Sequence, residues 1–188
     1  MTLPRVHYDE LSRKVDAFFA RVDSRHPGEV ACASGCTDCC KPGLSITGVE
    51  ALAIREALSA MDADRRQSLR ERARRVATET DAAGSCAALD PSGLCAVYEA
   101  RPLVCRSHGL PLRFAAEEAS VTGTRRLPVL DACFRNFTER ALSSIPADCV
   151  LDQQNLSTTL AAIDASFADA TGRPRFARDD LAAVLAET

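Results

Sequence analysis

Four cysteines lie within nine residues of this chain, at positions 32, 36, 39 and 40. Clustered thiolates are soft ligands, and proteins use them to hold zinc, copper(I) or iron–sulfur clusters. The surrounding Ser34-Gly35 and Pro42-Gly43 pairs favour a tight knuckle over a helix, because a proline disfavours helical geometry at the residue before it. Neighbouring side chains such as Cys39 and Cys40 diverge. This spacing therefore favours two neighbouring sites, or one centre with more than one metal.

The number of cysteines favours metal over disulfides. There are nine, and an odd count leaves one thiol unpaired in any scheme built only from disulfides. The first ten residues carry no apolar stretch of signal-peptide length, and no later run approaches the roughly 18 apolar residues of a membrane span. We therefore expect a cytoplasmic protein without a membrane partner, in a compartment where thiols stay reduced.

The hydrophobic periodicity predicts a mainly α-helical single domain spanning residues 1–188. Helices are expected at about 8–25, from a capping box at Thr47–Glu50 to about 60, at 65–75, at 153–170 with Gly172 ending it, and at 179–187. Residues 110–130 are ambiguous and leave room for at most a short hairpin, pairing Leu112–Phe114 with Val121–Thr122. We expect a metal-stabilised fold with an irregular cysteine-rich centre. Its metal-binding core is expected at about 32–133, and its C-terminal helices at about 150–187.

Six arginines in residues 65–75 raise the question of nucleic-acid binding. The net charge of −3 gives no overall attraction to nucleic acid. Glu71, Glu79 and Asp81 interrupt the basic character, and no aromatic residues interleave for base stacking. We interpret this segment as a solvated helix face and do not expect a nucleic-acid partner.

A second thiol segment carries cysteines at 86, 95 and 105. Between the first two, Asp90-Pro91-Ser92-Gly93 has the chemistry of a type I turn, which would fold Cys86 back toward Cys95. The two thiol segments together resemble the YkgJ-type cysteine-cluster family of zinc- or iron-chelating domains. The family pattern is C-x-x-x-C-x-x-C-C, a helical spacer, C-x-x-L, and then G-x-C-x-x-Y-x-x-R-P-x-x-C-R. The matching residues are Cys32, Cys36, Cys39, Cys40, Cys86, Leu89, Gly93, Cys95, Tyr98, Arg101, Pro102, Cys105 and Arg106.

This resemblance spans roughly residues 32–108 and implies metal ions as the bound partner, without implying a reaction. Spacing predicts seven thiolate ligands, with Cys133 as the eighth. The predicted metal ligands are Cys32, Cys36, Cys39, Cys40, Cys86, Cys95, Cys105 and Cys133. Cys149 could replace Cys133; the alternative for Cys149 is a buried apolar thiol.

Eight thiolates around two zinc ions would leave an excess charge of about −4, which cannot be buried without compensation. Arg101 and Arg106 bracket Cys105 and are expected to donate hydrogen bonds to the sulfurs. Tyr98 would be an apolar wall or a further donor to sulfur, and His108 is the candidate nitrogen ligand.

Two functions fit these residues. The first is a protein that holds an iron–sulfur or polynuclear metal centre with redox or catalytic use. The second is a zinc-stabilised, non-enzymatic binding module, with the closed all-protein coordination of structural zinc. The sequence does not choose between iron–sulfur and zinc, and it identifies neither a protein nor a small-molecule partner. We do not expect a serine, cysteine or histidine hydrolase, because the sequence shows no candidate nucleophile that is paired with a general base.

Overall fold

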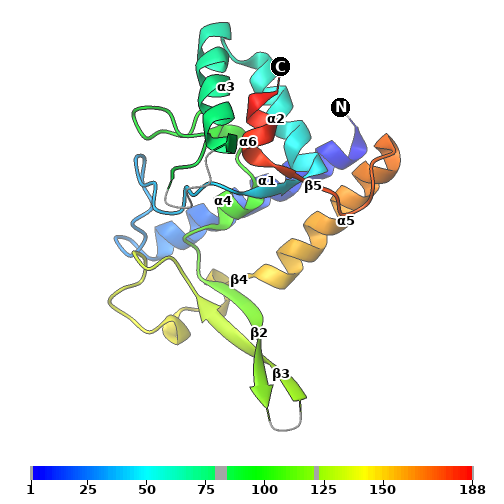
Figure 1. Ribbon diagram of the computed structural model, residues 1–188. Helices are drawn as coiled ribbons and strands as arrows, with labels where there is room; N and C mark the ends of the chain where they lie inside the picture. The colour runs from blue at the N-terminus through cyan, green and yellow to red at the C-terminus, as the bar shows by residue number, and fades with distance from the viewer. Residues whose placement is uncertain (1, 79–83, 121–122, 188) are drawn as a thin grey trace.

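The computed structural model describes residues 2–78, 84–120 and 123–187. Its longest helix, α1 (Leu3–Arg25), packs against α2 (Gly48–Ala60) and α5 (Gln153–Thr171) (Figure 1). α1 begins earlier than the predicted residue 8, because Pro4 in its first turn is preorganised for a helix start. A buried cluster joins these three helices. Its members are Tyr8, Val15, Val49, Ala53, Leu103, Leu156 and Phe167.

The predicted helix ends are confirmed where local capping signals exist. The backbone N–H of Thr47 donates to Glu50 Oε2 at 2.8 Å, which completes the capping box of α2. Asp152 accepts from the amide of Asn155 to start α5. Gly172 ends α5 with a φ of 71°, a left-handed conformation that glycine adopts without strain.

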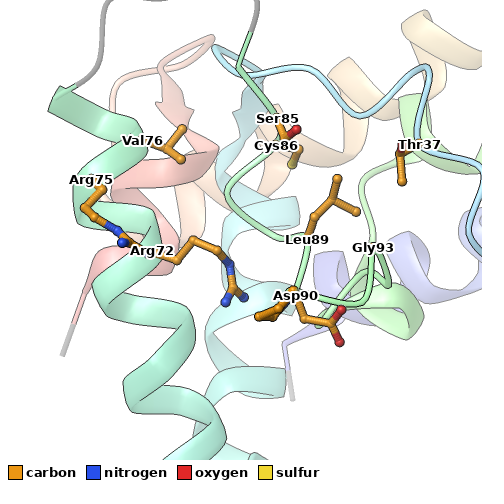
Figure 2. A pocket seen from close by; sticks show the side chains of 10 residues that line it. Thr37, Arg72, Arg75, Val76, Ser85, Cys86, Leu89, Asp90 and Gly93 are labelled. Carbon is orange, nitrogen blue, oxygen red and sulfur yellow. The ribbon is translucent and has the colours of Figure 1, made fainter.

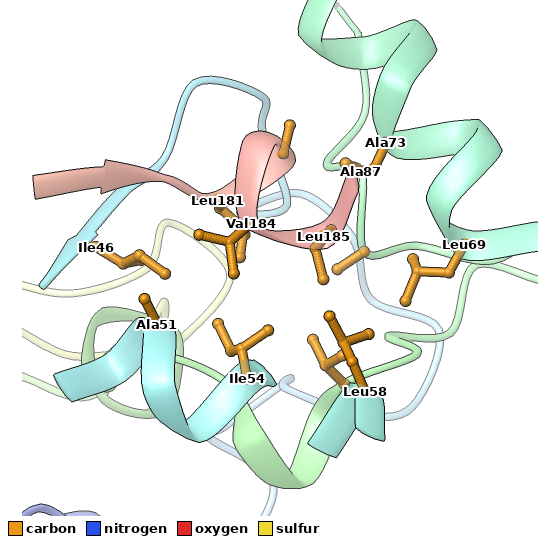
Figure 3. Packing of buried hydrophobic residues seen from close by; sticks show 13 residues of the cluster. Ile46, Ala51, Ile54, Leu58, Leu69, Ala73, Ala87, Leu181, Val184 and Leu185 are labelled. Atoms are coloured by element: carbon orange, nitrogen blue, oxygen red, sulfur yellow. The ribbon is translucent and has the colours of Figure 1, made fainter. Parts of the chain in front are cut away.

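A second cluster packs α3 (Ala63–Thr78) and the short C-terminal α6 (Leu181–Ala186) onto α2 (Figure 3). Ile54, Leu58, Leu69, Val184 and Leu185 are buried there. The partly buried Cys86 and Cys95 lie against the same cluster, so the second thiol segment rests directly on this helical layer.

The expectation of at most a short hairpin is wrong. β2 (Leu112–Ser120) and β3 (Gly123–Asp131) pair antiparallel over nine residues each, and β4 (Leu151–Asp152) adds to β2 in parallel. A separate pair joins β1 (Ser45–Thr47) to β5 (Arg178–Asp180). Alanines, charges and the edge-strand Pro128 dilute the alternating pattern of the hairpin, and the other pairings join residues far apart in sequence. The predicted partner Val121–Thr122 lies outside the described residues.

The remaining elements are short. α4 (Leu103–Ser107) carries Cys105, and 3₁₀ turns occur at Tyr98–Ala100, Leu142–Ser144 and Ala147–Cys149. A mainly helical fold is thus confirmed, with α6 beginning two residues later than predicted because Asp179 and Asp180 pair with β1. Within the described ranges, no helix has both the length and the apolar character that a membrane crossing requires.

Candidate metal centre

The first thiol segment folds as the predicted knuckle of tight turns. The amide of Cys36 donates to Ala33 O at 3.0 Å, and the amide of Cys40 donates to Thr37 O at 2.9 Å. Gly35, with a φ of 88°, supplies the left-handed conformation at the third position of the first turn. Two consecutive turns thus bring the cysteine side chains of this segment close together.

The second thiol segment docks on the knuckle through its backbone. The amide of Cys86 donates to Cys40 O at 3.0 Å, so the two cysteines are held side by side. The predicted Asp90 turn is present, because Gly93 N donates to Asp90 O at 3.0 Å, and Leu89 and Cys95 form an isolated β-bridge. This folds Cys95 back beside Cys86.

Cys105 is positioned by buried polar contacts of α4. The amide of Leu103 donates to Glu50 Oε1 at 2.9 Å, and the amide of Cys105 donates to Pro102 O at 2.9 Å. Glu50 is only 2% exposed, so this carboxylate fastens the start of α4 to the start of α2. The thiol of Cys105 is therefore presented from a fixed helical turn.

The sulfurs affect one another electrostatically, which shows which of them are neighbours. Burial raises the pKa of the Cys40 thiol to about 12, and nearby Cys39, Cys86 and Cys95 add to this shift. Cys105 as a residue is exposed, but its thiol lies among protein atoms, and this burial raises the pKa of the thiol to about 12. The charges of Cys86, Cys95 and Cys40 raise this pKa further. We name Cys40, Cys86, Cys95 and Cys105 the 40/105 group.

A second set of thiols lies around Cys32. Partial burial raises the pKa of the Cys32 thiol, and the charges of Cys133, Cys36 and Cys39 act in the same direction. We name Cys32, Cys36 and Cys133 the 32/133 group. Cys39 lies within electrostatic range of members of both groups, because Cys36 and Cys133 raise its pKa while its own charge acts on Cys86 and Cys105.

All nine cysteines are free thiols, as a metal-binding interpretation requires. Among the described residues, no three His, Cys, Asp or Glu side chains are arranged closely enough to hold an ion. The soft, unoxidised donor set fits zinc or iron. The structure therefore brings the thiols into two neighbouring groups without closing a coordination sphere.

Asn136 is a site residue that the sequence analysis missed. Its Nδ2 donates to Cys32 Sγ at 3.4 Å and to Gly109 O at 2.7 Å, while its Oδ1 accepts from the Ala31 amide at 2.8 Å. The side chain is 4% exposed. A Cβ on Gly109 would lie 2.5 Å from Cys32 Sγ, so only glycine fits beside this sulfur. Position 136 lies three residues after Cys133, but nothing in its local sequence signals a contact with residue 32.

The predicted arginine donors have different environments. Arg106, 7% exposed, donates its Nε to Arg101 O at 2.9 Å and its other nitrogens to Asp16 and to Glu99 O. Among the described residues its hydrogen bonds thus go to oxygen acceptors, and its predicted bond to sulfur stays a prediction. Arg101 bonds Asp16 Oδ1 at 3.0 Å and lies close enough to Cys95 to favour its thiolate.

The other predicted contacts lie nearer the surface. Tyr98 is 56% exposed, with the Arg101 guanidinium 4.0 Å from its ring centroid. His108 is exposed at the end of α4. Arg135, which was not predicted, pairs with Asp38 of the knuckle and lies within electrostatic range of Cys36 and Cys133. Positive charge is thus placed beside both thiol groups, by Arg101 and by Arg135.

Cys149 occupies a different environment from the other eight cysteines. It is fully buried in a third apolar cluster with Val22, Leu110, Phe137 and Ile145. Cys133, in contrast, lies near Cys32 and Cys39. These positions favour Cys133 as the eighth ligand and the buried apolar interpretation of Cys149.

Among the comparisons with known proteins, the match to a protein family bears on this site. No curated protein and no solved structure matches the chain. Residues 31–123 match the model of the CxxCxxCC family, described as "Putative zinc- or iron-chelating domain". The matched range contains the knuckle, the second thiol segment and Cys105, and it supports metal binding by these cysteines. The segment 31–123 therefore belongs to the CxxCxxCC family of zinc- or iron-chelating domains.

Proposed function

We propose that this protein holds an iron–sulfur or other polynuclear metal centre through eight thiolates and uses it in redox or catalytic chemistry. The observation that carries the proposal is the backbone docking of Cys86 on Cys40, which brings the two thiol segments together. Free thiols from the knuckle, the 86–105 segment and residue 133 then lie beside one another. Thiolates at this density are typical of metal centres.

The proposed ligands divide by neighbourhood. The 40/105 group supplies four sulfurs, and the 32/133 group with Cys39 supplies four more. Because Cys39 is in range of both groups, it is the candidate bridge if the two sites form one centre. An iron–sulfur cluster held there would supply one-electron transfer. Arg101 and Arg135 would offset part of the negative charge of the thiolates.

The test is the visible spectrum and composition of protein purified without oxygen. Brown protein that absorbs near roughly 400 nm and contains iron and inorganic sulfide supports the proposal. Colourless protein with stoichiometric zinc and no sulfide would replace it with the zinc-stabilised module. Protein with neither metal would contradict both.

One observation favours the binding module as a second candidate. Four large apolar side chains that flank cysteines in the sequence are exposed: Leu94, Tyr98, Val104 and Phe134. Large apolar side chains exposed beside the thiol segments are available for contact with a partner. A partner captured by the zinc-loaded protein, and lost with Phe134→Ser while zinc is retained, would support this second function.

A further inference from the structure

A pocket of about 420 Å³ opens between α3 and the second thiol segment (Figure 2). Arg72, Arg75 and Val76 of α3 line one wall, and Ser85, Cys86 and Leu89 line the other. Thr37 and Gly93 lie at its far end, so the pocket reaches from the arginine-rich helix to the knuckle. This volume falls within the range of small-molecule sites, about 300–1,000 Å³.

The charged groups of the pocket favour an anion. Two guanidinium groups line it against one carboxylate, Asp90. Asp90 Oδ1 is already used, because it accepts from Ser92 N, Ser92 Oγ and Leu94 N at 2.6–3.0 Å. Hydrogen bonds from Ser92 and Leu94, with a smaller contribution from Arg72, hold the pKa of this carboxyl below its ordinary value. The carboxylate therefore serves the turn, and the two guanidinium groups against one carboxylate leave the pocket lining with a net positive charge.

The two arginines are available in different ways. Arg72 Nε donates to Ala87 O at 3.3 Å, and this bond holds the guanidinium against the thiol segment. The two terminal nitrogens of Arg72 then remain to donate to an anion. The Arg75 side chain is exposed, and within the described ranges its guanidinium donates no hydrogen bond and forms no ion pair, although its backbone carbonyl accepts from Thr78 Oγ1. Planar guanidinium groups bind carboxylate and phosphate oxygens through paired hydrogen bonds.

We propose that this pocket binds a small oxyanion, a phosphate or a carboxylate, on Arg72 and Arg75 beside Cys86. Ser85 and Thr37 add hydroxyl groups that can donate to the same oxygens. The site gives the arginine-rich helix a role that the solvated-face interpretation leaves out. Access of the anion to a metal at Cys86 rests on the proposed function, but binding to the arginines does not.

The experiment is calorimetric titration of the full chain, purified without oxygen, with inorganic phosphate and separately with citrate. Arg75→Gln is the main variant, because its side chain is exposed and its loss leaves the fold intact. Arg72→Gln is the second variant, and Arg74→Gln, exposed on the same helix but outside the pocket lining, is the matched control. Circular dichroism and metal content are recorded for each protein.

We expect the wild type to bind one of the two anions, and we expect Arg74→Gln to bind that anion with the same affinity. Arg75→Gln and Arg72→Gln should each weaken binding at least about 10-fold, as loss of a charged hydrogen-bond donor does. Preference for phosphate or citrate identifies the chemical class.

Absence of binding by the wild type, or equal weakening by Arg74→Gln, would overturn the proposal. Binding of a single-stranded oligonucleotide that all three variants weaken would instead assign the helix to nucleic acid. Anion binding by protein that holds no metal would leave this site standing while the metal proposal fails.

Discussion

Asn136 joins three chain segments at one sulfur. Its amide group contacts Ala31, Gly109 and Cys32, and these contacts span up to 105 residues of sequence. The side chain is buried, and so is its hydrogen bond to Gly109 O, so loss of the amide group would leave this carbonyl without a partner. The position of Cys32 therefore depends on a residue that is not itself a ligand.

Replacing Asn136 by alanine should destabilise the protein by about 1–3 kcal/mol, because the buried carbonyl of Gly109 loses its partner and the Ala31 amide loses its acceptor. Urea unfolding measures this change. Asn155→Ala, at an exposed position of α5, is the control and should change stability by less than about 0.5 kcal/mol. Equal stability of the two variants would show that Asn136 does not fasten these segments.

The thiol pKa values predict how the metal-free protein responds to pH. Burial raises the pKa of Cys40 and Cys105 from an ordinary value of 9.0 to about 12. The folded protein then retains protons that the unfolded chain releases, so this contribution to stability is fully present below pH 9 and is lost as pH rises toward about 12. We expect the melting temperature of reduced, metal-free protein to fall over this window.

The control for the pH prediction is a pair of serine variants. Cys40→Ser should flatten the alkaline fall in melting temperature, because serine does not titrate there. Cys149→Ser should leave the fall as it is in the wild type. An alkaline limb that Cys40→Ser leaves unchanged would assign the loss of stability to other groups.

At the level of elements, Glu50 couples a helix start to the site. One oxygen completes the capping box of α2 and the other accepts from the first amide of α4, which carries Cys105. Glu50→Ala should therefore cost about 1.5–3 kcal/mol in urea unfolding, as loss of hydrogen bonds to a charged group does. Glu56→Ala, on the same helix, removes a surface ion pair with Arg5 and should cost under about 1 kcal/mol. The prediction fails if both variants lose the same stability.

Elements with local signals could be predicted from the sequence. The capping box at Thr47, the stop at Gly172 and the Asp90 turn each depend on residues within four positions of one another. The pairings of β1 with β5 and of β2 with β4 could not be predicted from the sequence, because they join residues about 135 and 39 positions apart. The same applies to the site, where Asn136 reaches Cys32 and Arg106 reaches Asp16.

At the level of the whole molecule, the described residues form three apolar clusters, and none of the predicted ligands is among the buried members of these clusters. Removal of metal by a chelator under reducing conditions should lower the melting temperature, because metal binding to thiolates supplies on the order of 10 kcal/mol. The helical circular dichroism at low temperature should persist, since the clusters remain. An unchanged melting curve after verified metal removal would show that the metal does not stabilise the fold.

The central claim is that clustered thiolates hold the metal, and metal content per chain tests it most directly. Wild type, Cys105→Ser and Cys149→Ser are purified side by side without oxygen and analysed by elemental analysis. We predict that Cys105→Ser loses metal, because a hydroxyl is a poor substitute for a thiolate in the 40/105 group. Cys149→Ser should keep the wild-type content, because that thiol is buried among apolar side chains. Full retention in Cys105→Ser together with loss in Cys149→Ser would contradict the account.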